Sequence, residues 1–487
     1  MKKFWKYFTL TILFLLGLGC VGVLYLFFVP TSTLFSIAYT TQNETIISEK
    51  YKTENLVEVQ LLSNNYNVNV IATETEEVSV KMFSNAFGFV KAKNENASII
   101  SNYNSDKNIA KFEVIEPSGF IFKGSSYINL YIPNNKELDL TIKNNKATTV
   151  LELSETGVKT LSYTAENGKA QLESGKVTTL LNLTLNKSNF EISEDAIVNE
   201  ADVKLSVTTG KFDAYNSTFK DIDIVKNDRG VILLKSCNNI TENVETAGGR
   251  IEAEEASYVN VKSSETNVYI TKITNGAIIE LSGSGKIKID ELSGAASTLQ
   301  SGYGSININK VNSEIYVKTT NGSIDVSNAY LLINLLIEGS GKATIKFAED
   351  AEHHNSNNRA RSVYALLKSG TLHCTGIENV DASSSGNSSI YANFINLYGE
   401  NEINNTNGST SIVINKDSVY KLTTNPDKDT VASVRVNLSQ IAEYNGYTNK
   451  SRKDVWVNCE ENANLGNTLT VANETGSILI LDTNFAK

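Results

Sequence analysis

The sequence predicts an all-β protein, a single-stranded parallel β-helix (β-solenoid) of about 19 residues per coil that follows an N-terminal transmembrane helix. Three observations support this prediction. A five-residue phrase, in which a small residue precedes two apolar residues spaced two apart, occurs ten times between Gly168 and Gly341. The phrases begin 17 to 22 residues apart, so each occupies the same corner of successive coils. Finally, residues 8–29 form an apolar run without a charge.

That apolar run is long enough to cross a bilayer as one helix. Three lysines precede it within residues 1–7, and no Lys or Arg follows until Lys50. The positive-inside rule therefore predicts a single-pass protein of the cell membrane, with residues 1–7 cytoplasmic and the C-terminal ectodomain extracellular. A cleaved signal peptide is the alternative, because the segment Ser36-Ile37-Ala38 could serve a peptidase.

The segment after the span changes in character twice. Residues 30–55 are polar and rich in Thr and Ser, and we interpret them as a linker. Residues 56–62 and 66–71 then alternate apolar and polar side chains, as strands do, but without the spacing of the later phrases. This predicts a β-rich N-terminal cap on a solenoid that extends to residue 417, since a cap protects the open edge of the first coil.

The phrases predict strands buried on one face, because their apolar residues lie two apart. Stacked in register, the two apolar positions form two inward ladders, in which each large side chain contributes roughly 1.5–3 kcal/mol. The first position is occupied by Ala170, Phe190, Phe212, Ile232, Ile251, Val268, Ile287, Ile306, Ile324 and Ala343. The second is occupied by Leu172, Ile192, Ala214, Leu234, Ala253, Ile270, Ile289, Ile308, Val326 and Ile345. The leading glycine suits a sharp corner, where positive φ is expected.

The pattern continues with weaker fidelity beyond Gly341. Three further phrases begin at Gly370, Ser388 and Thr410. Residues 349–362 lengthen the coil between Gly341 and Gly370 and predict a solvent-exposed loop. The period weakens beyond residue 417, so we expect residues 418–487 to form a C-terminal β cap.

Charge and cysteine content exclude some classes of function. The formal net charge of −10 disfavours nucleic acid and bare anionic membrane as partners. The three cysteines after the apolar run lie far apart and predict no disulfide framework.

The glycine corners and the entry segment Val57–Val70 resemble the bacterial putative-adhesin β-solenoid family, which includes head domains named for Gly-Ile-Asn. The segment Gly304-Ser-Ile-Asn307 is typical of it. The resemblance covers roughly residues 56–415 and implies a cell-surface β-solenoid. It brings no catalytic motif.

No coherent catalytic constellation is visible, so the sequence predicts a non-enzymatic, adhesin-like binding or structural module with no catalytic, cofactor-binding or metal residues. The alternatives are a polysaccharide-acting β-helix enzyme and a self-assembling scaffold like the bactofilins. Asp221 and Asp223 are the best carboxylate pair for an enzyme, roughly 6–7 Å apart on one strand face, but they read as solvated residues between core positions. The acidic group Glu252, Glu254 and Glu255 reads the same way. The three histidines do not have the spacing of a metal site.

Partner contact is expected at two kinds of position. Arg359 and Arg361 give the insertion positive charge on an otherwise acidic protein. Tyr269, Tyr316 and Tyr391 lie at outward strand positions, where they could bind sugar rings or pack across coils. The expected partner is a glycan or a surface protein, in addition to the membrane contacted by residues 8–29.

Overall fold

The computed structural model describes residues 11–17, 37–90, 96–117, 119–123, 126–245, 248–355, 358–424, 432–439, 441–446, 453–460 and 465–486. Strands make up most of these residues, which confirms the all-β prediction. The chain divides into two compact units. The first comprises Met1–Thr178 with Asp195–Ile197, and the second comprises Thr179–Glu194 with Val198–Lys487.

The predicted membrane span, residues 8–29, lies outside the described residues except for residues 11–17, which are helical. Among the residues with described positions, no helix has the length and apolar character needed to span a bilayer. The anchor therefore stays a prediction.

The first unit contains strands that pair partly in parallel and partly antiparallel. Its strands are β1 (Ile37–Ile47), β2 (Tyr51–Lys52), β3 (Glu58–Ser63), β4 (Asn67–Thr73), β5 (Glu77–Val90), β6 (Ser98–Asn104), β7 (Ile109–Ile115), β8 (Gly119–Lys123), β9 (Tyr127–Pro133), β10 (Asp139–Asn144), β11 (Thr148–Glu152), β12 (Val158–Ala165), β14 (Ala196–Ile197) and the first part of β13 (Lys169–Ile192).

Two pairing rules coexist in the first unit. Strand β3 lies between β7 and β10, and β4 lies between β9 and β11, all in parallel. Strand β5 instead pairs antiparallel with β1, β8 and β9, and β6 pairs antiparallel with β7. Strand β1 falls within the predicted linker 30–55, so that part of the segment is paired strand. Its Thr and Ile content favours this conformation.

The second unit begins with the remainder of β13 and continues with β15 to β34. They are β15 (Asp202–Val244), β16 (Arg250–Ser263), β17 (Asn267–Ile273), β18 (Ala277–Leu281), β19 (Ile287–Leu292), β20 (Ser297–Ser301), β21 (Ser305–Val311), β22 (Ile315–Thr319), β23 (Ser323–Ala329), β24 (Ile333–Ile337), β25 (Lys342–Phe347), β26 (Ser362–Leu367), β27 (Gly370–Ile377), β28 (Asn379–Phe394), β29 (Glu400–Ile414), β30 (Tyr420–Thr424), β31 (Ser433–Leu438), β32 (Ile441–Gly446), β33 (Lys453–Val457) and β34 (Thr468–Asp482).

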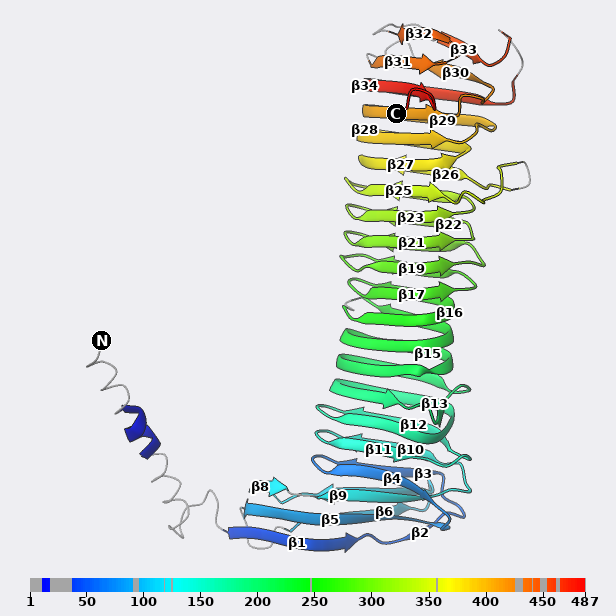
Figure 1. Cartoon of the computed structure of the whole chain (residues 1–487). Coiled ribbons are helices and arrows are strands. Elements are labelled where there is room, and N and C mark those ends of the chain that lie inside the picture. Colours follow the sequence, from blue (N-terminus) through cyan, green and yellow to red (C-terminus); the bar gives the residue numbers. More distant parts are fainter. Residues whose placement is uncertain are drawn as a thin grey trace. The chain divides into compact units, whose positions relative to one another are not determined.

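Strands of the second unit form two ladders of parallel strands. Within each ladder, successive strands are stacked one above another (Figure 1). In the first ladder β17, β19, β21, β23, β25 and β27 pair in that order. In the second ladder β18, β20, β22, β24 and β26 pair in that order. The long strands β16, β28, β29 and β34 contribute to both ladders.

The predicted inward residues form the core. Ile287, Ile306 and Ile324 are consecutive register partners in the first ladder. Every residue of the two predicted inward series is at most 5% exposed. The prediction of the core positions is therefore confirmed residue by residue.

One predicted phrase is displaced by two residues. Ser388 pairs with Gly408 and Ile390 pairs with Thr410, so the corner is Gly408 and Thr410 occupies the first inward position. Thr410 is tolerated there because its hydroxyl donates a 2.8 Å hydrogen bond to Asn473 Oδ1. A pattern search that allows only apolar residues at inward positions places this phrase wrongly.

A second polar residue interrupts the core. Glu242 is fully buried and pairs in register with Val261 of the second ladder. Asn227 Nδ2 donates a 3.0 Å hydrogen bond to its Oε1. Burial raises the pKa of Glu242, since a low-dielectric site disfavours the charged carboxylate.

The corner glycines are required by close approach between coils. A Cβ on Gly304 would lie 2.0 Å from the carbonyl oxygen of Gly285, and one on Gly322 would lie 2.0 Å from that of Gly304. Neither Gly304 nor Gly322 has a positive φ, unlike Gly408 with φ of 123°. The expectation of positive φ thus holds at some corners only. A buried side chain completes the corner, since Thr319 Oγ1 accepts a 2.9 Å hydrogen bond from the Gly322 amide.

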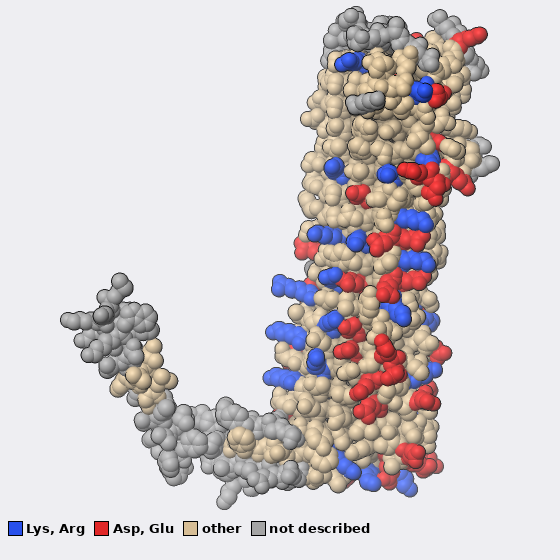
Figure 2. Space-filling model, viewed as in Figure 1, with Lys and Arg blue, Asp and Glu red and all other residues tan. Residues whose placement is uncertain are grey.

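On the face shown in Figure 2, Lys and Arg side chains of the second unit are interleaved with Asp and Glu side chains. Several ion pairs join neighbouring coils, including Lys262–Glu280 at 3.2 Å, Lys310–Glu291 at 3.2 Å and Lys318–Glu338 at 2.9 Å. Exposed pairs of this kind contribute about 0–1 kcal/mol each. They supplement the apolar core.

We predict that Gly322→Ala destabilises the protein by about 1–3 kcal/mol, because the added methyl group forces two coils apart. Thermal and urea unfolding measure the change. Gly466→Ala is the control, because no atom of the described residues lies within 4 Å of a Cβ at that position. Equal stability of the two variants would contradict the close approach of Gly322 to the Gly304 carbonyl.

Candidate functional site

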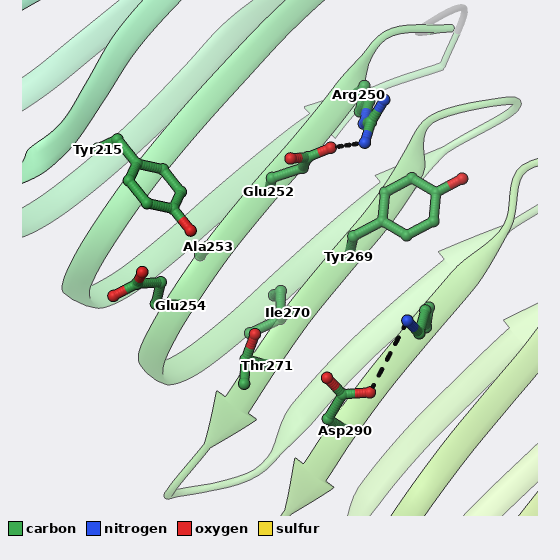
Figure 3. Close-up of a pocket in the computed structure, with 10 residues that line it drawn as sticks. Tyr215, Arg250, Glu252, Ala253, Glu254, Tyr269, Ile270, Thr271 and Asp290 are labelled. Atoms are coloured by element: carbon green, nitrogen blue, oxygen red, sulfur yellow. Dashed lines mark ion pairs between the residues drawn. The ribbon is translucent and has the colours of Figure 1, made fainter.

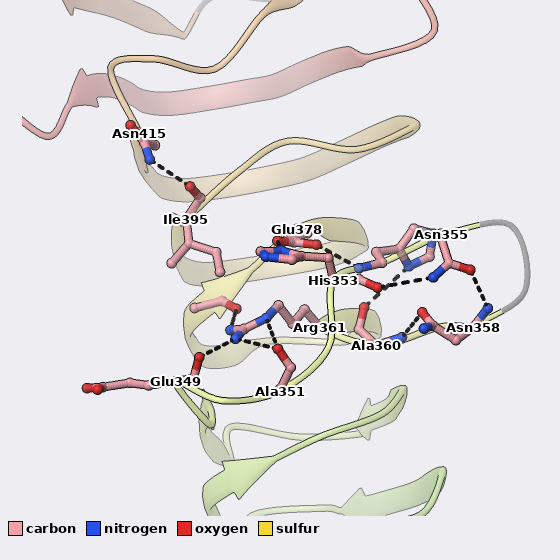
Figure 4. A network of polar contacts seen from close by, with 12 residues as sticks. Glu349, Ala351, His353, Asn355, Asn358, Ala360, Arg361, Glu378, Ile395 and Asn415 are labelled. Carbon is pink, nitrogen blue, oxygen red and sulfur yellow. Dashed lines mark hydrogen bonds and ion pairs between the residues drawn. The ribbon is translucent and has the colours of Figure 1, made fainter.

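The insertion between β25 and β26 is held by a buried arginine. Arg361 is 3% exposed and donates to three backbone carbonyls, those of Glu349 at 2.9 Å, Ala351 at 2.9 Å and Gly376 at 3.1 Å (Figure 4). The expectation that Arg361 gives the loop surface charge is therefore wrong. A guanidinium has five N–H donors, and these carbonyls satisfy donors that burial would otherwise leave unpaired.

A buried carboxylate fixes the other side of the same loop. Glu378 is 1% exposed, and its Oε2 accepts a 2.7 Å hydrogen bond from the His354 amide. Its Oε1 lies 2.5 Å from His353 Nδ1, and its own amide donates to the Arg361 carbonyl. The base of the insertion is thus an ordered framework.

Arg359 remains on the surface of the insertion. It is exposed and lines a cavity of about 450 Å³ together with Glu314, Asn355 and Tyr364. His354 lines this cavity and also a second cavity of about 540 Å³. His354 is positioned by a 2.8 Å contact between its Nδ1 and Ser362 Oγ and by packing against Tyr398.

The second cavity lies over an outward column of the second ladder. Register partners place Tyr364, Asp381, Glu402, Thr470 and Thr423 on successive strands, and all five line the cavity. The same column continues in the other direction through Asn334 to Tyr316. The sequence-predicted Tyr316 therefore shares a face with this cavity, two strands away from Tyr364.

Acidic side chains outnumber basic ones in the lining of this cavity. Asp381 is exposed, yet partial desolvation of its carboxyl group, followed by the neighbouring carboxylate of Glu402, raises its pKa. Asn404 Nδ2 donates to Glu402. Lys421 lies 3.0 Å from Asp454 and 5.2 Å from the ring centre of Trp456, so its charge is already engaged.

The remaining predicted tyrosines lie on the first ladder, away from this column. Tyr391 stacks on His373 of the preceding strand, with ring centres 4.3 Å apart. Burial and Lys342 lower the pKa of His373. Tyr269 lines a separate groove shown in Figure 3. The five predicted contact residues therefore do not form one site.

Three of the residues weighed for catalysis have local partners. Asp221 accepts a hydrogen bond from Asn239, Glu252 pairs with Arg250, and Glu255 lies 3.4 Å from Lys272. Among the residues whose placement is described, no group of three or more His, Cys, Asp or Glu could hold a metal ion. Cys237 and Cys374 are buried free thiols, as predicted for Cys374.

Comparisons with known proteins give little further information. No family model matches the chain, and no curated protein matches it. A crystal structure described as a putative cell adhesion protein from Clostridium sporogenes aligns with 91% of this chain and 100% of its own, at 7% identity. Its TM-score of 0.18 is too low to establish a common fold.

The sequence did not reveal Tyr364, Asp381, Glu402 and His354 as neighbours. The lengthened coil before β26 breaks the period, so the column can be followed only when register across the insertion is known. In the sequence, the insertion was the one feature that indicated a site near these residues.

We predict that Arg361→Ala releases the insertion, because three carbonyls lose their donor. Limited proteolysis followed by mass spectrometry should show faster cleavage within residues 349–362. Arg359→Ala, at an exposed position two residues away, should cleave like the wild type. Identical cleavage of the two variants would contradict the clamping role of Arg361.

Proposed function

We propose that the chain is a membrane-anchored surface protein whose exposed part is a β-solenoid, and that it acts as a non-enzymatic, adhesin-like binding module. Residues 8–29 would span the membrane with residues 1–7 in the cytoplasm. The uncharged run and the lysines before it support the anchor. The parallel ladders of the second unit, with their regular register, support the solenoid.

The observation that carries the binding proposal is the ordered base of the insertion. Arg361 and Glu378 are buried and bonded, while Arg359 and His354 line cavities of about 450 and 540 Å³ beside them. A loop that is ordered before binding loses less entropy when a partner docks. Loops on a regular scaffold are also where binding residues concentrate.

The chemistry of the lining favours a glycan as the partner. Carboxylates, hydroxyls, an imidazole and the Tyr364 ring face the cavity over the column. Such groups exchange hydrogen bonds with sugar hydroxyls, and a tyrosine supplies an apolar face with a polar end. The column continues to Tyr316, which would suit an extended saccharide.

A glycan-cleaving enzyme is the second candidate, and the Asp381–Glu402 pair is the observation that favours it. Register partners in parallel strands have Cα atoms roughly 4.8 Å apart, similar to the spacing of about 5–5.5 Å between the carboxyl groups of retaining glycosidases. A raised pKa on one member is typical of a general acid. We rank this candidate second because both residues are exposed, so the site does not exclude water.

A glycan array probed with the purified chain tests the proposal. We expect Arg359→Ala and Tyr364→Ala to weaken binding of the best glycan by about tenfold or more, because each removes an anchor from the cavity wall. Tyr303→Ala is the control, since Tyr303 is 63% exposed and lines neither cavity.

Two outcomes would contradict the proposal. Wild-type binding by both cavity variants would remove the insertion as the binding surface. Release of reducing sugar ends by the wild type, lost in Asp381→Asn, would assign the cavity to catalysis instead.

A further inference from the structure

The first ladder carries a groove that shares no lining residue with the two cavities at the insertion. It lies on β15, β16, β17 and β19 and has a volume of about 220 Å³, room for roughly seven water molecules. Figure 3 shows Tyr215 and Tyr269 on opposite sides, with Glu252 between them and Glu254 below Tyr215. Two aromatic walls around a polar floor are typical of small-molecule sites.

Both tyrosine rings are held by local contacts. The guanidinium carbon of Arg250 lies 5.0 Å from the ring centre of Tyr269, and Arg250 also pairs with Glu252. Tyr215 donates a hydrogen bond to Glu254, and this bond raises the pKa of the phenol. Tyr215 is still 46% exposed, so part of its side chain is accessible to a ligand.

The charges in the groove disfavour an anionic ligand. Arg250 and Lys288 face three carboxylates, those of Glu252, Glu254 and Asp290, which leaves one negative charge. Arg250 is committed to Glu252, and Lys288 lies 4.0 Å from Asp290. An ionised carboxylate offers about four lone-pair sites, so Glu254 and Asp290 can accept further hydrogen bonds from hydroxyl donors.

We infer that this groove is a binding site for a neutral oligosaccharide, with the C–H face of one sugar ring on Tyr215 and hydroxyls along the saccharide chain donating to Glu254 and Asp290. The inference goes beyond the insertion site, because the two sites lie on different ladders and share no residue. A protein with both would hold one glycan chain, or two neighbouring chains, at separate points.

Isothermal titration calorimetry of the full-length chain tests the inference with two probes, a neutral tetrasaccharide of glucose and a tetrasaccharide of galacturonic acid. The neutral probe should bind and the acidic probe should bind at least about tenfold more weakly. Tyr215→Ala should weaken binding of the neutral probe by about tenfold or more, and Tyr215→Phe by about threefold, because the ring remains while its anchor to Glu254 is lost. Tyr303→Ala should bind like the wild type.

The insertion variant Tyr364→Ala separates this site from the proposed one. It should leave binding of the neutral probe at the groove unchanged, whatever its effect on the array. The inference is overturned if the neutral probe does not bind at concentrations up to about 10 mM, or if Tyr215→Ala binds it as the wild type does. Loss of binding in Tyr364→Ala alone would also overturn it, by assigning the saccharide to the insertion.

Discussion

In-register hydrogen bonding between parallel neighbouring strands is the constraint on which the rest of the second unit depends. Strands of both ladders pair in parallel with the strand of the next coil, as Ile287 does with Ile306. This pairing fixes which side chains face inward, because a shift of one residue would turn every side chain to the other face. It also brings the corners so close that Gly304 and Gly322 have no room for a Cβ.

The same constraint explains where binding surfaces can form. Outward positions lie in straight columns, so residues far apart in sequence, such as Tyr364 and Thr470, line one cavity. A regular column offers a shallow surface, such as the groove of about 220 Å³ on β15–β19, whereas the cavities at the insertion measure about 450 and 540 Å³. The insertion forms one wall of the cavities beside it. The buried Arg361 and Glu378 stabilise the insertion, so the outward residues of the column are not needed for this.

Much of the fold could be predicted from the sequence because burial imposes a period of two within strands and of about 19 between coils. The inward residues were identified correctly on this basis. Buried polar residues were not predicted: Thr410 and Glu242, for example, are buried where Asn473 and Asn227 bond to them. Such pairs have no signature in an apolar pattern.

The candidate sites were less accessible to sequence analysis. Arg359 and Arg361 look alike in the sequence, yet one is exposed and the other is buried among carbonyls. Tyr269 and Tyr316 both alternate with core residues, but they lie on different ladders. Their neighbours are set by register across coils of unequal length, which local patterns do not determine.

Disulfide trapping of register partners is the most direct test of this account. Asn307 pairs with Asp325, and Asp325 pairs with Thr344. Adjacent partners lie roughly 4.8 Å apart between Cα atoms and alternate ones about twice that, whereas a disulfide requires less than about 7 Å. Asn307→Cys with Asp325→Cys should cross-link under mild oxidation, and Asn307→Cys with Thr344→Cys should not. Cross-linking of only the second pair, or of neither pair in the folded protein, would contradict in-register stacking of the coils.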